Sequence, residues 1–220
     1  MPVPIRMTKI HHACLTIDDG STRLLLDPGQ LGPRPSLDAV TAVLITHRHV
    51  DHLDPELVAE ALRRGIPVWA PGDALGDIGV PDGIEDGGLH EAVPGTTLRI
   101  GSLSVQVAGE RHAELHPALP GPENRAYLID QRLFVTGDEH PVPPGRLTTL
   151  VTPADAPWLR ATDLIRYVRD VRPELVVGVH DGLLNADGLS VARHVIDSLR
   201  DEGATRATML SDGESIDIPG

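Results

Sequence analysis

Four side chains of the kind that bind metals crowd into six residues directly after an apolar run. The stretch VLITHRHVDHLD covers residues 43–54, and the four side chains in it are those of His47, His49, Asp51 and His52. The apolar residues before them are typical of a buried β-strand. A lone histidine after a strand is usually a turn residue. Four such residues together are hard to explain as a solvated turn, so we expect a fold that opens a polar site where this strand ends.

The rest of the chain predicts an α/β fold with mixed sheets. Hairpins are predicted over 15–27, 97–108 and 125–138, and DPELVAEALRRG predicts a helix over 54–65. In that helix Asp54 is the expected N-cap, Pro55 the first helical residue and Gly65 the end. Later patterns predict a helix over 163–171, a strand over 175–179 and a helix over 190–202 that ends at Gly203. Strands alternate with helices in this last part, which favours an α/β domain.

Four predicted strands each end at a histidine or an aspartate. The residues are His47, His112, Asp138 and His180. Ligand sites of α/β sheets lie at the carboxyl ends of strands. Histidine and carboxylate together suit zinc, manganese or iron. We therefore expect these residues to complete one metal site.

The spacing within 47–52 indicates room for two ions. Residues at i and i+2 of an extended loop point to the same side, so His47 and His49 can share one metal. Asp51 and His52 lie further along, where the chain starts to coil, and can reach a second metal. A carboxylate such as Asp138 has two oxygens and can bridge both. Two ions about 3.5–4 Å apart would clamp a water or hydroxide between them.

Composition narrows the class of protein. The chain has 220 residues without a clear linker, so we expect a single domain over 1–220. Its formal charge of −13 argues against nucleic acid as a partner. The start MPVPIRMTKI lacks the apolar core of a signal peptide, and no run reaches membrane-spanning length. We expect a cytoplasmic protein without a membrane span; a homo-oligomer is left open.

Several motifs in sequence order resemble those of the metallo-β-lactamase superfamily. THRHVDH matches the HxHxDH signature, and KIHHACLTID…RLLLDPG resembles the N-terminal region of the lactonase-like and phosphodiesterase-like branches. GERHAELHPALPGPENRAYLID followed by LFVTGDE resembles the segments of the third histidine and the bridging aspartate, and VVGVHDG that of the last histidine. The resemblance implies a four-layer αβ/βα sandwich of two mixed β-sheets, with metals at one edge between the sheets.

The same resemblance implies roles for individual residues. His47, His49 and His112 would bind the first ion, whereas Asp51, His52 and His180 would bind the second. Asp138 would bridge the two ions, which we expect to be zinc, with manganese or iron as alternatives.

Several further residues are candidates for a role near the site or in the core. Asp27 would support a ligand histidine from outside the ligand set. His12 occupies the family's GH position, where a place near the site and a structural role are equally open. His112 is favoured over His116 as the third histidine, and His116 could instead face substrate. Trp158 could line the pocket, although packing is the simpler reading, and Cys14 reads as a small core residue. The remaining histidines have no supporting spacing: His90, His140 and His194.

The predicted activity is metal-dependent hydrolysis of a small ester or lactone. A hydroxide bridged by two ions would attack the substrate, with Asp51 as the catalytic residue that orients it. A phosphodiesterase acting on a small or lipid-like ester is the enzyme alternative. An iron-dependent sulfur dioxygenase and a non-catalytic metal-binding protein are further alternatives, because a fold does not settle chemistry.

Overall fold

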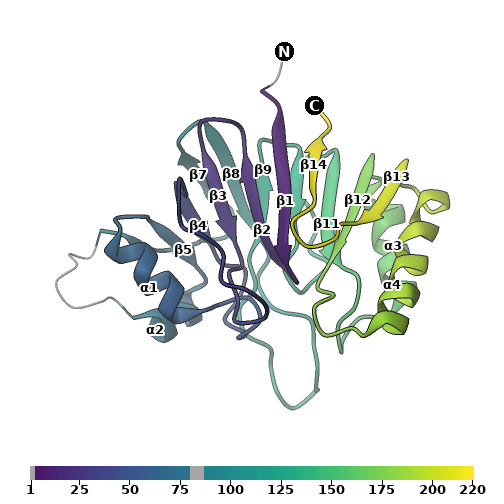
Figure 1. Ribbon diagram of the computed structural model, residues 1–220. Coiled ribbons are helices and arrows are strands. Elements are labelled where there is room, and N and C mark those ends of the chain that lie inside the picture. The colour runs from purple at the N-terminus through teal and green to yellow at the C-terminus, as the bar shows by residue number, and fades with distance from the viewer. Residues whose placement is uncertain (1–2, 80–86) are drawn as a thin grey trace.

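The chain ends join the first of two mixed β-sheets. The computed structural model describes residues 3–79 and 87–220, and within them this sheet has the order β14-β1-β2-β3-β4-β5-β6 (Figure 1). Neighbours from β14 to β3 are antiparallel, and those from β3 to β6 are parallel. Its strands are β14 (Ser215–Ile218), β1 (Ile5–His11), β2 (Cys14–Asp18), β3 (Arg23–Leu26), β4 (Ala42–Leu44), β5 (Val68–Ala70) and β6 (Leu89–Glu91).

The second sheet comes from the later part of the chain. Among the described residues its order is β13-β12-β11-β10-β9-β8-β7. Neighbours from β7 to β10 are antiparallel, and those from β10 to β13 are parallel. Its strands are β13 (Arg206–Met209), β12 (Leu175–Val179), β11 (Thr149–Pro153), β10 (Leu133–Val135), β9 (Ala126–Ile129), β8 (Leu103–Ala108) and β7 (Thr97–Ile100).

Helices cover the outer faces of both sheets, which makes four layers (Figure 1). The helices are α1 (Pro55–Arg63), α2 (Leu75–Ile78), α3 (Ala161–Val171) and α4 (Ala186–Ser198), with single 3₁₀ turns at η1 (Gly72–Ala74) and η2 (Leu199–Asp201). Buried residues of α1 pack in one cluster with β4 and β5, and those of α3 and α4 pack with the second sheet. A third cluster, mostly aliphatic, fills the space between the sheets. The predicted αβ/βα sandwich is confirmed.

Helix α1 forms as its sequence predicts. Buried residues at Leu57, Val58, Ala61 and Leu62 make one apolar face. The Asp54 carboxylate accepts hydrogen bonds from the N–H groups of Glu56 (3.1 Å) and Leu57 (3.3 Å), which have no partner inside the helix.

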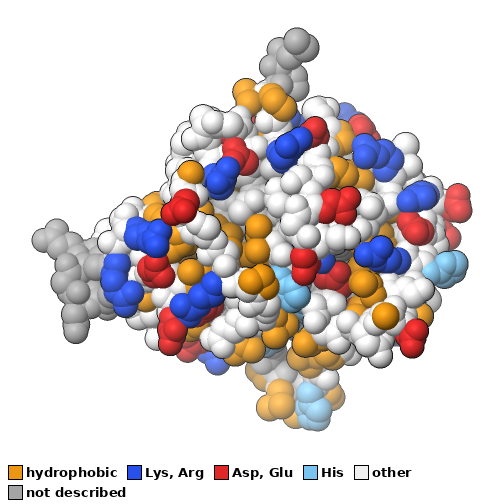
Figure 2. Space-filling model, viewed as in Figure 1, with side chains coloured by type: hydrophobic (Ala, Val, Ile, Leu, Met, Phe, Trp, Pro, Cys, Tyr) orange, Lys and Arg blue, Asp and Glu red, His pale blue; other side chains and the backbone are white. Residues whose placement is uncertain are grey.

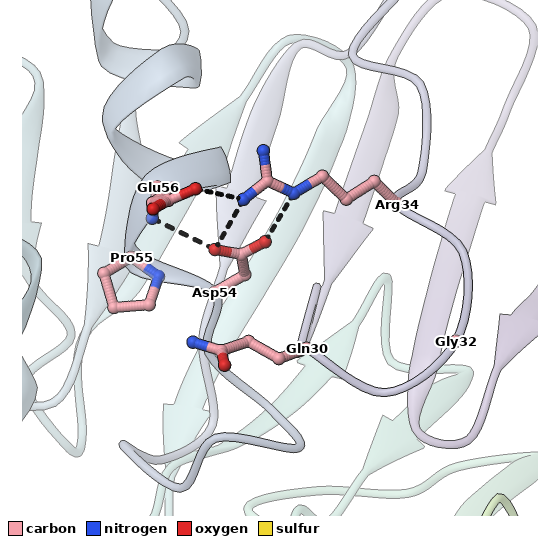
Figure 3. A pocket seen from close by; sticks show the side chains of 7 residues that line it. Gln30, Gly32, Arg34, Asp54, Pro55 and Glu56 are labelled. Atoms are coloured by element: carbon pink, nitrogen blue, oxygen red, sulfur yellow. Dashed lines mark hydrogen bonds and ion pairs between the residues drawn. The ribbon is translucent and has the colours of Figure 1, made fainter.

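A surface pocket of about 540 Å³ lies beside this helix end (Figure 3). Arg34 donates from Nε to Asp54 (2.8 Å) and from its terminal nitrogen to Glu56 (2.7 Å). Two carboxylates therefore neutralise the guanidinium in this pocket. Asp54 is thus held by the first N–H groups of the helix and by Arg34 from an earlier loop. These contacts fix the point at which the loop 47–54 ends.

The predicted element ends need correction in the last third. The helix predicted over 190–202 begins at Ala186, because the Asn185 side chain caps it by accepting from the Gly188 N–H (2.8 Å). It ends at Ser198, and the 3₁₀ turn η2 follows it. The helix predicted over 163–171 begins two residues earlier, at Ala161.

Two further expectations concern the whole chain. The domain predicted over 1–220 includes residues 1–2 and 80–86, which lie outside the described residues. In the part that is described, none of the helices has the length and apolar character needed to cross a membrane.

Candidate metal centre

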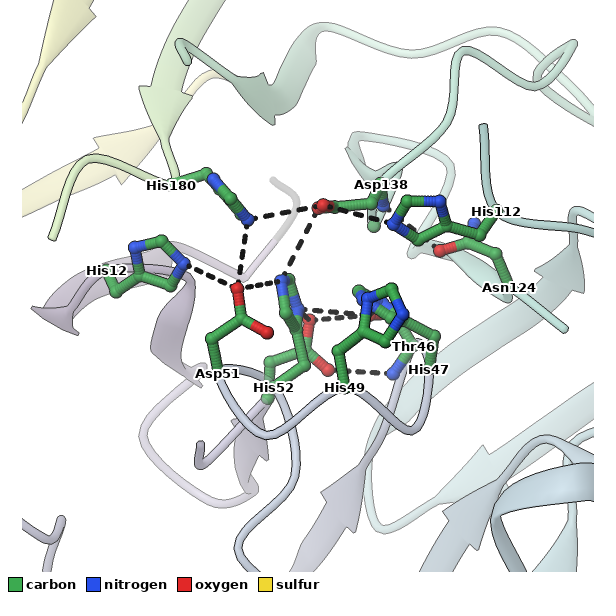
Figure 4. A network of polar contacts seen from close by, with 12 residues as sticks. His12, Thr46, His47, His49, Asp51, His52, His112, Asn124, Asp138 and His180 are labelled. Atoms are coloured by element: carbon green, nitrogen blue, oxygen red, sulfur yellow. Dashed lines mark hydrogen bonds and ion pairs between the residues drawn. The ribbon is translucent and has the colours of Figure 1, made fainter. Parts of the chain in front are cut away.

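The structure brings all seven predicted metal ligands together at one edge of the sandwich (Figure 4). They come from four loops, each of which follows a strand of the first or the second sheet: β4, β8, β10 and β12. Most of them are almost completely buried; His47 has 0% of its surface exposed and Asp138 has 3%. Burying so many ionisable groups costs free energy unless they are paired or bind a cation.

One group of candidate ligands consists of imidazoles alone. The side-chain nitrogens of His47, His49 and His112 lie within 4.8 Å of one another. His47 Nε2 and His49 Nδ1 are 3.1 Å apart. Two nitrogens that bind one tetrahedral zinc ion at its usual bond length are separated by about 3.3 Å. We call these three residues the imidazole group.

The other group contains a carboxylate. Ligand atoms of Asp51, His52 and His180 lie within 4.8 Å of one another, and His12 is within the same reach. The chain turns after His49, whose carbonyl accepts from the His52 N–H (2.9 Å), and the His52 ring lies beside that of His47, with centroids 4.0 Å apart. We call Asp51, His52 and His180 the carboxylate group.

Asp138 lies between the two groups. Its Oδ1 is 3.4 Å from His52 Nε2, and its Oδ2 is 3.5 Å from His112 Nε2 and 3.2 Å from His180 Nε2. Its backbone N–H donates to Asn124 Oδ1 (3.0 Å), which holds the residue in place. One carboxylate thus reaches both groups, as a bridging ligand must.

In four of the candidate histidines, Nδ1 contacts an oxygen atom that lies outside the set of candidate ligands. A ring that donates Nδ1–H presents the Nε2 lone pair, which is the form that binds a metal. The contacts are His47 to Thr46 Oγ1 (3.0 Å), His52 to Asp27 Oδ2 (2.8 Å), His112 to the Ala113 carbonyl (2.7 Å) and His180 to the Asp155 carbonyl (2.7 Å).

Asp27 holds one histidine of each group in place, His52 directly and His47 through Thr46. Its Oδ2 accepts from His52 Nδ1 and from the Thr46 hydroxyl (2.7 Å), and Thr46 is the partner of His47. Its Oδ1 accepts from the Thr46 N–H (2.7 Å). Nearby, Gly29 is required by close approach, because a Cβ there would lie 1.9 Å from the Asp51 carbonyl oxygen. The loop after β3 therefore fixes the loop that carries the ligands.

Three buried atoms at the centre make no hydrogen bond with the described residues, although each lies within ion-pair distance of an oppositely charged group. Within the described chain, His52 Nε2, His180 Nε2 and Asp138 Oδ1 are buried and make no hydrogen bond. Buried polar atoms without a hydrogen bond are rare and call for an explanation. All three point into the space between the two groups, and a divalent cation would satisfy them together. The donor set of imidazole nitrogens and carboxylate oxygens therefore fits zinc, manganese or iron.

The electrostatics of the site also favour a cation. Burial lowers the pKa of His47 well below its ordinary value, so the ring stays neutral. Burial alone would raise the pKa of Asp138, but the neighbouring His52, His112 and His180 hold it well below its usual range. Burial likewise lowers the pKa of His180, yet Asp138 and Asp51 outweigh it and raise the pKa to about 10. The two carboxylates thus attract positive charge to this point.

The candidate His116 lies apart from these groups, as do the three histidines to which the sequence assigned no role. His116 is exposed in the loop after β8, where its Nδ1 accepts from the Ala118 N–H (3.1 Å). His90 stacks on Trp69, His140 stacks on Tyr167, and His194 is exposed on α4. Cys14 is buried, and burial raises the pKa of its thiol.

Trp158 is a neighbour of the centre that the sequence reading assigned to packing. Its indole N–H donates to Asp138 Oδ2 (3.3 Å), and its ring lies edge-on to that of His112 with centroids 6.2 Å apart. The side chain is half-buried. The sequence could not show this contact, because it joins the loop after β11 to the loop after β10.

Comparison with known proteins agrees with the fold. Residues 6–180 match the sequence pattern described as the beta-lactamase superfamily domain. The chain belongs to the metallo-β-lactamase superfamily. This member is 30% identical to protein Rv0786c of Mycobacterium tuberculosis over 195 residues, which cover 85% of this chain and 89% of the relative. The predicted family is confirmed.

Solved structures share the metallo-β-lactamase fold over nearly the whole length. Igni18 of Ignicoccus hospitalis, described as a novel metallo hydrolase, aligns with a TM-score of 0.68 and 15% identity over 99% of both chains. YhfI of Bacillus subtilis, described as a metallo-beta-lactamase fold protein, aligns with a TM-score of 0.70 and 12% identity over 98% of this chain and 100% of YhfI. At these identities the likeness is one of fold.

Proposed function

We propose that this superfamily member, a metal-dependent hydrolase, cleaves a small ester or lactone with two divalent ions. The imidazole group would hold one ion, the carboxylate group the other, and Asp138 would bridge them. The observation that carries the proposal is the set of three buried atoms on His52, Asp138 and His180 that make no hydrogen bond in the described part of the chain. We also propose that the two sheets form one domain, since a single aliphatic cluster joins them.

The chemistry of such a pair of ions is known in general terms. Bound ions supply a hydroxide nucleophile near neutral pH by lowering the pKa of water from about 15.7 toward about 7, and they polarise the oxygen under attack. The chain's own residues supply the geometry. Asp51 faces the centre and is placed to orient the nucleophile; Thr46 and Asp27 keep His47 and His52 in the ligand tautomer.

The lack of a basic partner for the ligands supports an uncharged substrate. Among the described residues, no lysine or arginine is a hydrogen-bond or ion-pair partner of the seven candidate ligands, and residues 80–86 contain neither. A phosphodiester would gain from a guanidinium or ammonium beside the ions. Charges of both signs are interspersed on the face shown in Figure 2, which also speaks against nucleic acid there.

The test combines metal analysis with a substrate panel. Wild type, chelated protein and the Asp51→Asn variant are offered lactones, carboxylic esters, phosphodiesters and thioesters. We expect two ions per chain in wild type and lactone or ester turnover that depends on the ions and on Asp51. Asp187→Asn, on the exposed start of α4, serves as the control for an aspartate remote from the ligands.

Other results would redirect the assignment. Turnover of phosphodiesters alone would favour the phosphodiesterase. Equal turnover by wild type, chelated protein and Asp51→Asn would exclude metal-dependent hydrolysis. A single iron per chain with consumption of oxygen would favour the dioxygenase.

A further inference from the structure

Two histidines approach the same oxygen of Asp51. His12 Nε2 lies 3.2 Å from Asp51 Oδ2, and His180 Nε2 lies 3.3 Å from it (Figure 4). Both side chains are nearly buried, and their ring centroids are 4.0 Å apart. By distance alone, either histidine could be a metal ligand of the carboxylate group.

The partners of the two Nδ1 atoms separate these histidines. His180 Nδ1 faces the carbonyl oxygen of Asp155 (2.7 Å), which only accepts hydrogen bonds. His180 must therefore donate from Nδ1, and a ring that loses its other proton to make way for a metal has its lone pair on Nε2. That lone pair is what a metal needs.

His12 is in the opposite state. Its Nδ1 accepts from the backbone N–H of Gly182 (2.9 Å), which only donates. Nδ1 therefore carries no proton, and the one proton of the neutral ring is on Nε2. Because that atom faces Asp51 Oδ2, it donates a hydrogen bond there and has no lone pair left for a metal.

We propose that His12 is a positioning residue that donates Nε2–H to Asp51, with its tautomer set by the Gly182 backbone, and that it is not a metal ligand. The role rests on the proposed function only in taking Asp51 as a metal ligand. A carboxylate oxygen accepts more than one hydrogen bond or metal contact, so Asp51 Oδ2 can serve His12 and an ion together.

The surrounding backbone holds His12 in this arrangement. The His180 N–H donates to the His12 carbonyl (3.2 Å), and both residues have left-handed backbones, with φ of 52° at His12 and 65° at His180. This conformation is unfavourable for residues other than glycine. Gly182 approaches closely: a Cβ there would lie 3.0 Å from His12 Cβ and 3.1 Å from His12 Nδ1, which is tighter than ordinary contact.

The arrangement predicts what each substitution does to metal binding. Loss of a hydrogen-bond partner behind a ligand weakens metal affinity by about 10- to 100-fold. We expect this loss for the second zinc ion in His12→Ala. His12→Gln can place an amide N–H near the position of Nε2, so its affinity should stay close to that of wild type. His180→Gln, at a proposed ligand, should lose the second ion.

Two measurements test the proposal. Competition with a chelator gives the zinc affinities of wild type, His12→Ala, His12→Gln and His180→Gln. NMR of ¹⁵N-histidine-labelled protein gives the tautomer of each ring, with the His12 signals assigned from their absence in His12→Gln. We expect His12 to carry its proton on Nε2 in both metal-free and zinc-loaded protein, and zinc-loaded His180 to carry it on Nδ1.

Each other outcome is decisive. A proton on Nδ1 of His12 in zinc-loaded protein, or a His12→Gln variant as weak as His180→Gln, would make His12 a ligand and overturn the proposal. Wild-type affinity in His12→Ala would also overturn it. A wild type that binds a single zinc ion would contradict the two-ion function instead, and the tautomer measurement would still decide the role of His12.

Discussion

The two halves of the metal centre are built in different ways. Each group takes two of its three members from the loop 47–52, and the imidazole group contains no carboxylate. The carboxylate group contains Asp51, draws His180 from the second sheet, and depends on His12 from the turn between β1 and β2. Both groups therefore form only when the two sheets meet, and the carboxylate group depends on a third segment as well, the turn that carries His12.

The two ions therefore differ in what their binding requires of the folded chain. An ion in the imidazole group needs the loop 47–49 and one further histidine, His112. Both ions need the docking of the two sheets, and an ion in the carboxylate group also needs the left-handed backbones at His12 and His180. Strain of this kind persists only where the surrounding structure enforces it. We therefore expect the carboxylate group to respond more strongly to changes outside the ligands.

Removal of both ions should have the largest effect, because ligands of each group come from both sheets. A ligand at 1,000 times its dissociation constant stabilises the folded state by about 4 kcal/mol. Chelation should therefore abolish activity and lower the unfolding temperature, and added zinc should restore both. Calorimetry and activity assays of the chelated and reloaded protein check this. An unchanged unfolding temperature would mean that no ion ties the sheets together.

Asp138→Asn comes next, because this residue reaches both groups. The variant lacks the negative charge between the proposed ions, and we expect activity to fall by about 10³-fold. Elemental analysis should show loss of metal from both groups. Asp130→Asn is the matched control: Asp130 also follows a strand of the second sheet, and its left-handed backbone suits asparagine. If Asp138→Asn lost one ion and kept the other, the bridging role would be wrong.

His112→Ala should affect the imidazole group alone. We expect it to lose one ion, because His112 Nε2 faces the centre while its Nδ1 is engaged by a carbonyl. His116→Ala should keep the metal content of wild type, since His116 is exposed and bonded within its own loop. Elemental analysis of the two variants decides between them. The reverse pattern would place His116 in the centre.

Trp158→Phe should have the smallest effect. The substitution keeps an aromatic ring but removes the N–H that donates to Asp138. Loss of one hydrogen bond to a charged group costs about 1.5–3 kcal/mol at most, and less where water can replace it, as at this half-buried side chain. We expect a severalfold loss of metal affinity.

Fluorescence offers a matched control for Trp158, because the chain has two tryptophans. Metal binding should change the emission of Trp158, and this response should be retained in Trp69→Phe, since Trp69 stacks on His90 away from the centre. A metal response that survives in Trp158→Phe and is lost in Trp69→Phe would show that Trp158 does not sense the centre.

Much of the fold could be predicted because its signals are local. The cap at Asp54, the apolar face of α1 and the hairpin turns depend on neighbours within a few residues, and each lies where the sequence predicts it. The start of α4 was missed by four residues, since Gly188 suggests a loop. The Asn185 cap outweighs the low helix propensity of glycine there.

The sequence by itself determined which chemical groups the site contains. Strand ends at His47, His112, Asp138 and His180, together with the spacing of 47–52, depend on periodicity and on turns, which a chain carries locally. The tertiary structure alone decided what each group faces. The Nδ1 partners of His12 and His180 and the contact of Trp158 with Asp138 join segments that are far apart in sequence. A histidine's tautomer is set by its hydrogen-bond partner, and that partner is known only after the chain has folded.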